Sequence, residues 1–96
     1  MVLEFSGEAI SWRGPAPYVF VPVPLDLSEE IKAVASLATY GWGAIPVTVW
    51  IGETESTTSL FPKDGRYLVP VKKAVQERER LSVGDRTAVR LELTLR

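Results

Sequence analysis

Five cations gather in the last third of the chain, and their types and spacing suit a phosphate-binding surface. They lie before, within and after a segment expected to be helical: Arg66, Lys72, Lys73, Arg78 and Arg80. Lysine and arginine neutralise phosphates, so nucleic-acid affinity that depends on them weakens as salt rises. The alternative is a solvated helix face, since Glu77 and Glu79 interleave with these cations. We favour that alternative, because the whole chain carries a net charge of −1.

Three tryptophans in a chain of 96 residues form the second group of interest. Trp12 and Trp42 lie beside loops rich in glycine and proline, whereas Trp50 lies in an alternating segment and faces away from its apolar neighbours. An exposed tryptophan offers a flat apolar face and one hydrogen-bond donor, which suits a binding platform. The alternative for Trp12 and Trp42 is a plug at the end of a barrel.

The chain has no histidine and no cysteine, which removes imidazole bases, thiolate nucleophiles and nearly all zinc sites. Four loop carboxylates remain, Glu53, Glu55, Asp64 and Asp85, and their spacing matches no metal-binding loop. The two aspartates adjoin glycines, where turn chemistry explains them better than acid–base catalysis. A serine–lysine pair between the hydroxyl-rich run 56–59 and Lys72 or Lys73 is disfavoured against a polar strand face. We therefore expect no catalysis, no cofactor and no metal.

Composition predicts one globular domain over residues 1–96, with 46% hydrophobic and 24% charged residues. No apolar run approaches the ~20 residues that span a bilayer. The start, Met1 to Phe5, has no basic region before an apolar stretch, so no signal peptide is expected. We expect a cytoplasmic location, with which the absence of cysteine is compatible.

Charge is distributed unevenly along the chain. Residues 1–61 carry two basic and seven acidic groups, a net of −5, and residues 62–96 carry nine basic and five acidic groups, a net of +4. We expect folding to interleave the two halves so that these charges compensate, because charge patterns of this kind bear on partners rather than on the fold.

Apolar alternation and turn residues predict six strands, over residues 2–10, 18–23, 45–51, 56–62, 66–71 and 86–95. A helix is predicted from Asp26, with Glu29 completing a capping box, an apolar stripe of Leu27, Ile31, Val34 and Ala38, and an end at Tyr40-Gly41-Trp42-Gly43. A second, short helix is predicted over 72–81, with Val71, Ala74, Val75 and Arg78 on its inner side. The Lys63-Asp64-Gly65 sequence predicts a hairpin turn.

The predicted elements repeat the order β-β-α-β in two halves, about 1–53 and 54–96. Val21-Pro22-Val23 precedes the first helix and Val69-Pro70-Val71 the second. Two such halves, related by a pseudo-two-fold axis, predict a mainly-β fold: a six-stranded closed or split β-barrel with two short capping helices. A chance match is the alternative, because Val-Pro-Val is a common tripeptide.

Two sequence blocks carry a resemblance to a known family. Thr58-Ser59-Leu60-Phe61-Pro62 and Pro70-Val71-Lys72-Lys73-Ala74-Val75, followed by Leu81-Ser82-Val83-Gly84-Asp85, resemble the bacterial YdeI/OmpD-associated domain family of unknown function over nearly the whole chain. That resemblance implies a double-split barrel like those of AbrB- and MazE-type swapped-hairpin DNA-binding proteins, and it implies no reaction. The chain departs from the family pattern at Gln76, where another basic residue is expected, and in its acidic loop 52–55.

We therefore expect a non-catalytic binding or accessory module that uses Trp42, Trp12 and the basic second helix. The first alternative is a nucleic-acid-binding regulator with a basic C-terminal surface. The second alternative is a small enzyme that uses carboxylates or lysine. A protein or small-molecule ligand is the expected partner. The chain is expected to be a monomer or a homodimer without membrane association.

Overall fold

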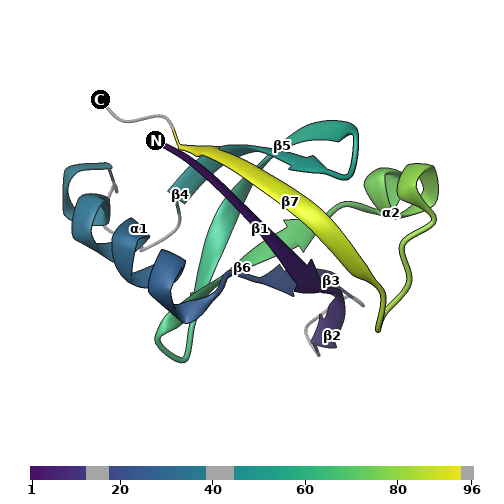
Figure 1. Cartoon of the computed structure of the whole chain (residues 1–96), viewed down its shortest axis with the longest axis horizontal. Helices are drawn as coiled ribbons and strands as arrows, with labels where there is room; N and C mark the ends of the chain where they lie inside the picture. The colour runs from purple at the N-terminus through teal and green to yellow at the C-terminus, as the bar shows by residue number, and fades with distance from the viewer. Residues whose placement is uncertain (13–17, 39–44, 94–96) are drawn as a thin grey trace.

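The computed structural model describes residues 1–12, 18–38 and 45–93, and these form seven strands and two helices. The strands are β1 (Val2–Glu8), β2 (Ile10–Trp12), β3 (Tyr18–Pro22), β4 (Ile45–Ile51), β5 (Thr54–Lys63), β6 (Arg66–Val71) and β7 (Arg86–Leu93). The helices are α1 (Leu25–Ala38) and α2 (Lys73–Glu79), and they lie at opposite ends of the molecule (Figure 1). The mainly-β class is confirmed.

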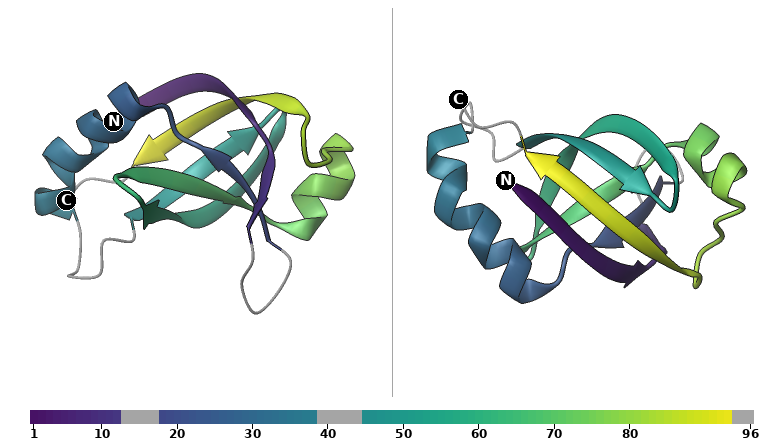
Figure 2. Two further views of the ribbon diagram at one scale, coloured as in Figure 1. Left: turned by 90° about the horizontal axis from the view of Figure 1, so that it is seen from below. Right: turned by 45° about the horizontal axis from the view of Figure 1, so that its top comes forward.

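The strands form one antiparallel sheet in the order β1-β7-β4-β5-β6-β3-β2, which curls into a half-barrel (Figure 2). The prediction of a six-stranded barrel is wrong in its strand count. The barrel is also not closed, since no ladder joins the edge strands β1 and β2 in the part of the chain that the structure describes.

The seventh strand arises because the N-terminal run, predicted as one strand over 2–10, breaks at Ala9. The buried Ala9 donates its N–H to the Asp85 carbonyl at 2.8 Å and accepts the Gly84 N–H at 2.8 Å. Ala9 therefore bonds with the turn before β7 instead of with a strand. The chain changes partner at this point, since β1 pairs with β7 and β2 pairs with β3.

Strand β5 makes the same change of partner without a break. Residues 54–60 pair with β4, and residues 61–63 pair with β6. The two halves therefore correspond strand by strand: β1 and β2 together correspond to β5, β3 corresponds to β6, and β4 corresponds to β7. When each strand is replaced by its counterpart, the same set of paired strands results. A pseudo-two-fold repeat predicts such a pattern, while the boundary between the halves stays a prediction.

The main core lies inside the curl of the sheet. Every second residue of β4 is buried, beginning with Ile45, and Val89, Leu91 and Leu93 of β7 are buried as their alternation predicts. Helix α1 adds Ile31, and helix α2 adds Val75. The predicted continuation of β7 to residue 95 and the helix end at 40–43 lie outside the described residues.

Both helices depart from their predicted details. Helix α1 begins at Leu25, where the Pro24 carbonyl accepts the Ser28 N–H at 2.8 Å, and no hydrogen bond of a capping box is present within the described ranges. Helix α2 is shorter than predicted because Arg80 adopts a left-handed conformation (φ 49°) that ends it. Its inner side is also narrower than predicted, since Ala74 and Arg78 are exposed.

The hairpin between β5 and β6 is confirmed. Asp64 (φ 51°) and Gly65 (φ 82°) are its two loop residues, and both have the positive φ that a type I′ turn requires. The turn therefore sets Lys63 directly opposite Arg66.

Candidate functional site

A second apolar cluster covers the outer face of the strands β2, β3, β6 and the end of β5. Phe20 and Leu68 are 5% and 3% exposed, yet they are not part of the main core. The register explains this: Ile10 lies opposite Phe20, and Leu68 lies opposite Pro22 and Phe61. Directly opposed residues point to the same face of a sheet, so these side chains face away from the core.

Trp12, the last residue of β2, packs over this face. Its ring centroid lies 5.8 Å from that of Phe20 in an edge-to-face contact and 5.4 Å from that of Phe61 in a tilted contact. We call Trp12, Phe20, Phe61 and Leu68 the outer cluster. The preferred interpretation of Trp12 from the sequence, a plug at a barrel end, is thus wrong, because Trp12 is half-buried on the outer surface of the sheet.

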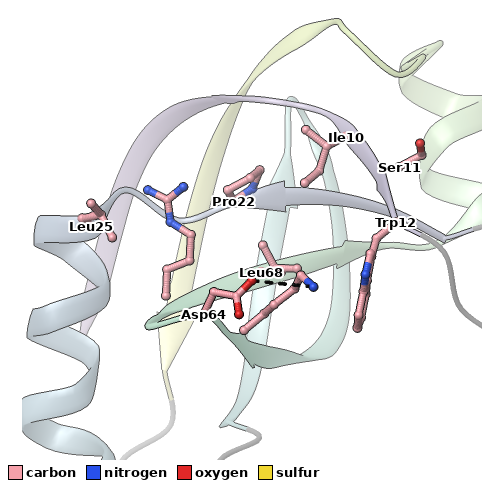
Figure 3. Close-up of a pocket in the computed structure, with 9 residues that line it drawn as sticks. Ile10, Ser11, Trp12, Pro22, Leu25, Asp64 and Leu68 are labelled. Atoms are coloured by element: carbon pink, nitrogen blue, oxygen red, sulfur yellow. Dashed lines mark ion pairs between the residues drawn. The ribbon is translucent and has the colours of Figure 1, made fainter.

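A cleft of about 380 Å³ opens beside the outer cluster. Its lining residues come from β2, the end of β3, the start of α1 and the β5–β6 hairpin: Ile10, Ser11, Trp12, Pro22, Leu25, Lys63, Asp64, Arg66 and Leu68. We call it the Trp12 cleft. Figure 3 shows Trp12 and Leu25 on opposite sides, with Asp64 between them. Leu25 is 58% exposed, so the rim of the cleft offers apolar surface to solvent.

Among the described residues, three charged side chains line the Trp12 cleft, and all come from the β5–β6 hairpin. The Lys63 ammonium lies 4.1 Å from the centroid of the Trp12 ring, a cation–π contact, and 3.8 Å from an Asp64 carboxylate oxygen. The Nε of Arg66 is buried and has no hydrogen-bond partner among the described residues. A buried donor without a partner is energetically unfavourable. Arg66 is therefore suited to donate a hydrogen bond to an acceptor atom of a ligand.

The structure divides the residues predicted from the sequence between two places. Trp12 and Arg66 line the cleft together. Lys72, Lys73, Arg78 and Arg80 are exposed around α2. The six-residue strand β6 separates Arg66 from this second group by about 20 Å, so the five cations do not form one surface. Trp42 lies outside the described residues.

Sequence reasoning missed Lys63 and Phe61 as site residues. In the sequence, Lys63 stands out only as a turn residue, and Phe61 stands out only as part of the block 58–62. A signal was present, because a two-residue Asp-Gly turn sets the flanking Lys63 and Arg66 opposite each other. Turn chemistry does not predict that Lys63 and Phe61 contact Trp12, because β2 and β5 are not neighbours in the sheet.

The third tryptophan, Trp50, lies in a separate cleft of about 380 Å³ on β1, β4 and β7. It faces away from the buried residues of β4, as predicted. Arg90 lies 5.1 Å from its ring centroid and 4.0 Å from a Glu4 carboxylate oxygen. The cation of this cleft is therefore already paired, which makes the site a weaker candidate than the Trp12 cleft.

Two of the four loop carboxylates, Asp64 and Asp85, behave as turn residues, whereas Glu55 lies on strand β5 rather than in a loop. Asp85 accepts the Ser82 N–H at 2.9 Å, and Asp64 occupies the left-handed position of its hairpin. Within the described ranges, no group of three acidic residues is placed to hold a metal ion. No helix there is both long and apolar enough to cross a membrane.

These features define a small domain with a curled antiparallel sheet, a helix at each end and an aromatic cleft on its outer face. The domain of unknown function DUF1905 matches residues 5–91 of the chain. The chain therefore belongs to this family of uncharacterised domains. Comparison with curated proteins found no match.

Proposed function

We propose that the chain is a non-catalytic binding module and that the Trp12 cleft is its ligand site. One observation carries the proposal: an aromatic cluster separate from the core lies beside a cleft that combines apolar walls with Arg66, whose buried Nε has no hydrogen-bond partner among the described residues. Small-ligand sites are concave and mostly apolar, with a few polar groups that orient the ligand. As part of this proposal, the chain is related to the YdeI/OmpD-associated domains, and its fold is related to the double-split barrels.

The proposal is tested by nuclear magnetic resonance on the whole chain with a panel of aromatic fragments. Binding in the cleft is expected to shift the Trp12 indole N–H and the backbone amides of Ser11 and Arg66. Trp12→Ala is expected to weaken binding about tenfold, because a central aromatic contact contributes roughly 1–2 kcal/mol. Trp50→Ala is the matched control and should leave the affinity unchanged. Shifts confined to other surfaces, or equal losses in both variants, would refute the proposal.

The second candidate function, nucleic-acid binding, is favoured by one observation only: Lys72, Lys73, Arg78 and Arg80 are all exposed around α2. Glu77 is exposed among them, which lowers the local positive charge. We expect duplex DNA to bind no better than the nonspecific range of roughly 10⁻⁴–10⁻⁶ M at physiological salt. Tighter binding that weakens steeply with salt and disappears in the Lys72→Glu, Lys73→Glu double variant would establish this second function instead.

A further inference from the structure

We infer that the Trp12 cleft selects organic anions, namely molecules with a flat apolar body that carry a carboxylate. This inference rests on the proposed function, because it names the class of ligand for the same site. It is argued from the charges that line the cleft and from the shape of its apolar walls.

The charge balance of the cleft is positive. Lys63 and Arg66 are cations, and Asp64 is the single anion among the lining residues. Asp64 is paired with Lys63 at 3.8 Å, which leaves the Arg66 guanidinium without an ion-pair partner in the part of the chain that the structure describes. A guanidinium donates several parallel hydrogen bonds, and a carboxylate accepts them in matching geometry.

The buried Nε of Arg66 also favours an anionic ligand. Because this donor has no partner among the described residues, a ligand acceptor that reaches it would satisfy a group that the fold leaves unpaired. A neutral ligand would gain the apolar contacts without the charge pairing. A cationic ligand would meet Lys63 and Arg66 together and would have to compete with Lys63 for the Trp12 ring.

The apolar walls set the shape of the ligand body. Trp12, Ile10 and Leu68 form the inner walls, and the exposed Leu25 stands at the rim. A volume of about 380 Å³ lies within the range of ~300–1,000 Å³ that is usual for small-ligand sites. A two-ring aromatic body fits these dimensions, and its acidic group would point toward the β5–β6 hairpin.

The test uses three probes of one shape and different charge: 2-naphthoate, 2-naphthamide and 2-naphthamidine. Each is titrated into the full chain while the Trp12 indole N–H and the cleft amides are followed by nuclear magnetic resonance. We expect 2-naphthoate to bind about tenfold more tightly than 2-naphthamide, the factor that a charge-assisted hydrogen bond supplies. We expect 2-naphthamidine to bind most weakly.

Three single-residue variants test the charge argument on the folded protein. Asp64→Asn removes the anion that the described residues contribute to the cleft and keeps a residue that tolerates positive φ, so 2-naphthoate should bind about threefold more tightly. Glu55→Gln makes the same change of net charge on exposed β5 surface and should leave the affinity unchanged. Arg66→Gln should remove the preference for 2-naphthoate over 2-naphthamide.

The possible failures are distinguishable. Equal binding of all three probes at the Trp12 signals would overturn the ligand class and leave the proposed function standing. Weaker binding of 2-naphthoate by Asp64→Asn would also overturn the ligand class. No shift of the cleft signals by any probe at millimolar concentration would overturn both the ligand class and the binding site.

Discussion

Gly7 lies where β1 passes close to β3. A Cβ at this position would lie 2.6 Å from Val21 Cγ1 and 3.4 Å from the Pro22 carbonyl oxygen. Val21 is fully buried, so its methyl group has little room to move away. The glycine therefore serves close packing between two strands that are not hydrogen-bonded to each other.

Gly7→Ala is expected to lower the free energy of unfolding by about 1–3 kcal/mol, the usual effect of overpacking a core. Urea denaturation monitored by circular dichroism measures this change. Ser6→Ala, at the exposed neighbouring position, is the control and should change stability by less than about 0.5 kcal/mol. Equal stability of the two variants would contradict the close approach of β1 and β3 at Gly7.

Tyr67 is a buried titratable residue on β6. Burial disfavours the phenolate and raises the pKa of Tyr67 above its ordinary value of 10.0. The protonated phenol therefore contributes stability that is fully present below pH 10 and is lost as the pH rises through the folded-state pKa.

We expect the free energy of unfolding to fall as the pH rises above 10, and Tyr67→Phe to remove this part of the fall. Urea titrations of both proteins between pH 8 and pH 11 test the expectation, since those values bracket the ordinary tyrosine pKa of about 10. Parallel pH profiles for the two proteins would contradict it.

At the scale of elements, each helix is tied to the backbone just before it by the same kind of contact: α1 to Val23, which follows β3, and α2 to Val71, the last residue of β6. The Ser28 hydroxyl of α1 donates to the Val23 carbonyl at 3.2 Å, and the Gln76 amide of α2 donates to the Val71 carbonyl at 2.8 Å. Five residues separate donor and acceptor in both cases. Ser28 also accepts the Tyr67 N–H at 3.2 Å, so it links α1 to β6.

Ser28→Ala should cost about 1–3 kcal/mol, because it leaves the buried Tyr67 N–H without an acceptor. Gln76→Ala should cost less, about 1 kcal/mol, since its contact is only partly buried. Thermal or urea unfolding ranks the two variants, with the exposed Ser59→Ala as the control. A larger loss for Gln76→Ala would reverse the assignment of Ser28 as the stronger tie.

At the scale of the whole molecule, neither half of the chain can complete a sheet alone. The ladders β1–β7, β4–β5, β4–β7 and β3–β6 all join residues 1–53 to residues 54–96. Of the ladders between the described strands, the remaining two, β2–β3 and β5–β6, each lie within one half. Isolated hairpins are marginal in water, so the halves depend on each other.

Fragments 1–53 and 54–96 are therefore expected to be unfolded separately and to form the native sheet when mixed in equal amounts. Circular dichroism of each fragment and of the mixture tests this, with a mixture of 1–53 and the Gly7→Ala form of 1–53 as a control that supplies no partner strands. A stable sheet in either fragment alone would contradict the interleaved topology.

Much of the fold follows from local sequence. The alternation in 45–51 and 86–93 and the Asp-Gly turn predicted the central strands and the β5–β6 hairpin correctly, because a half-buried strand needs apolar residues at every second position. The break at Ala9 was not predictable, since it depends on hydrogen bonds to Gly84 and Asp85, far along the chain. The same limit explains the seventh strand.

For the candidate site, the sequence by itself determined the residue types: two tryptophans beside segments rich in glycine and proline, a basic C-terminal part, and no histidine or cysteine. Only the tertiary structure decided which of them meet. It placed Trp12 on Phe20, Phe61 and Lys63, and it separated Arg66 from the cations of α2. The physical reason is that alternation and turn residues act over a few positions, whereas the curl that folds β2 over the β5–β6 hairpin results from ladders between strands distant in sequence.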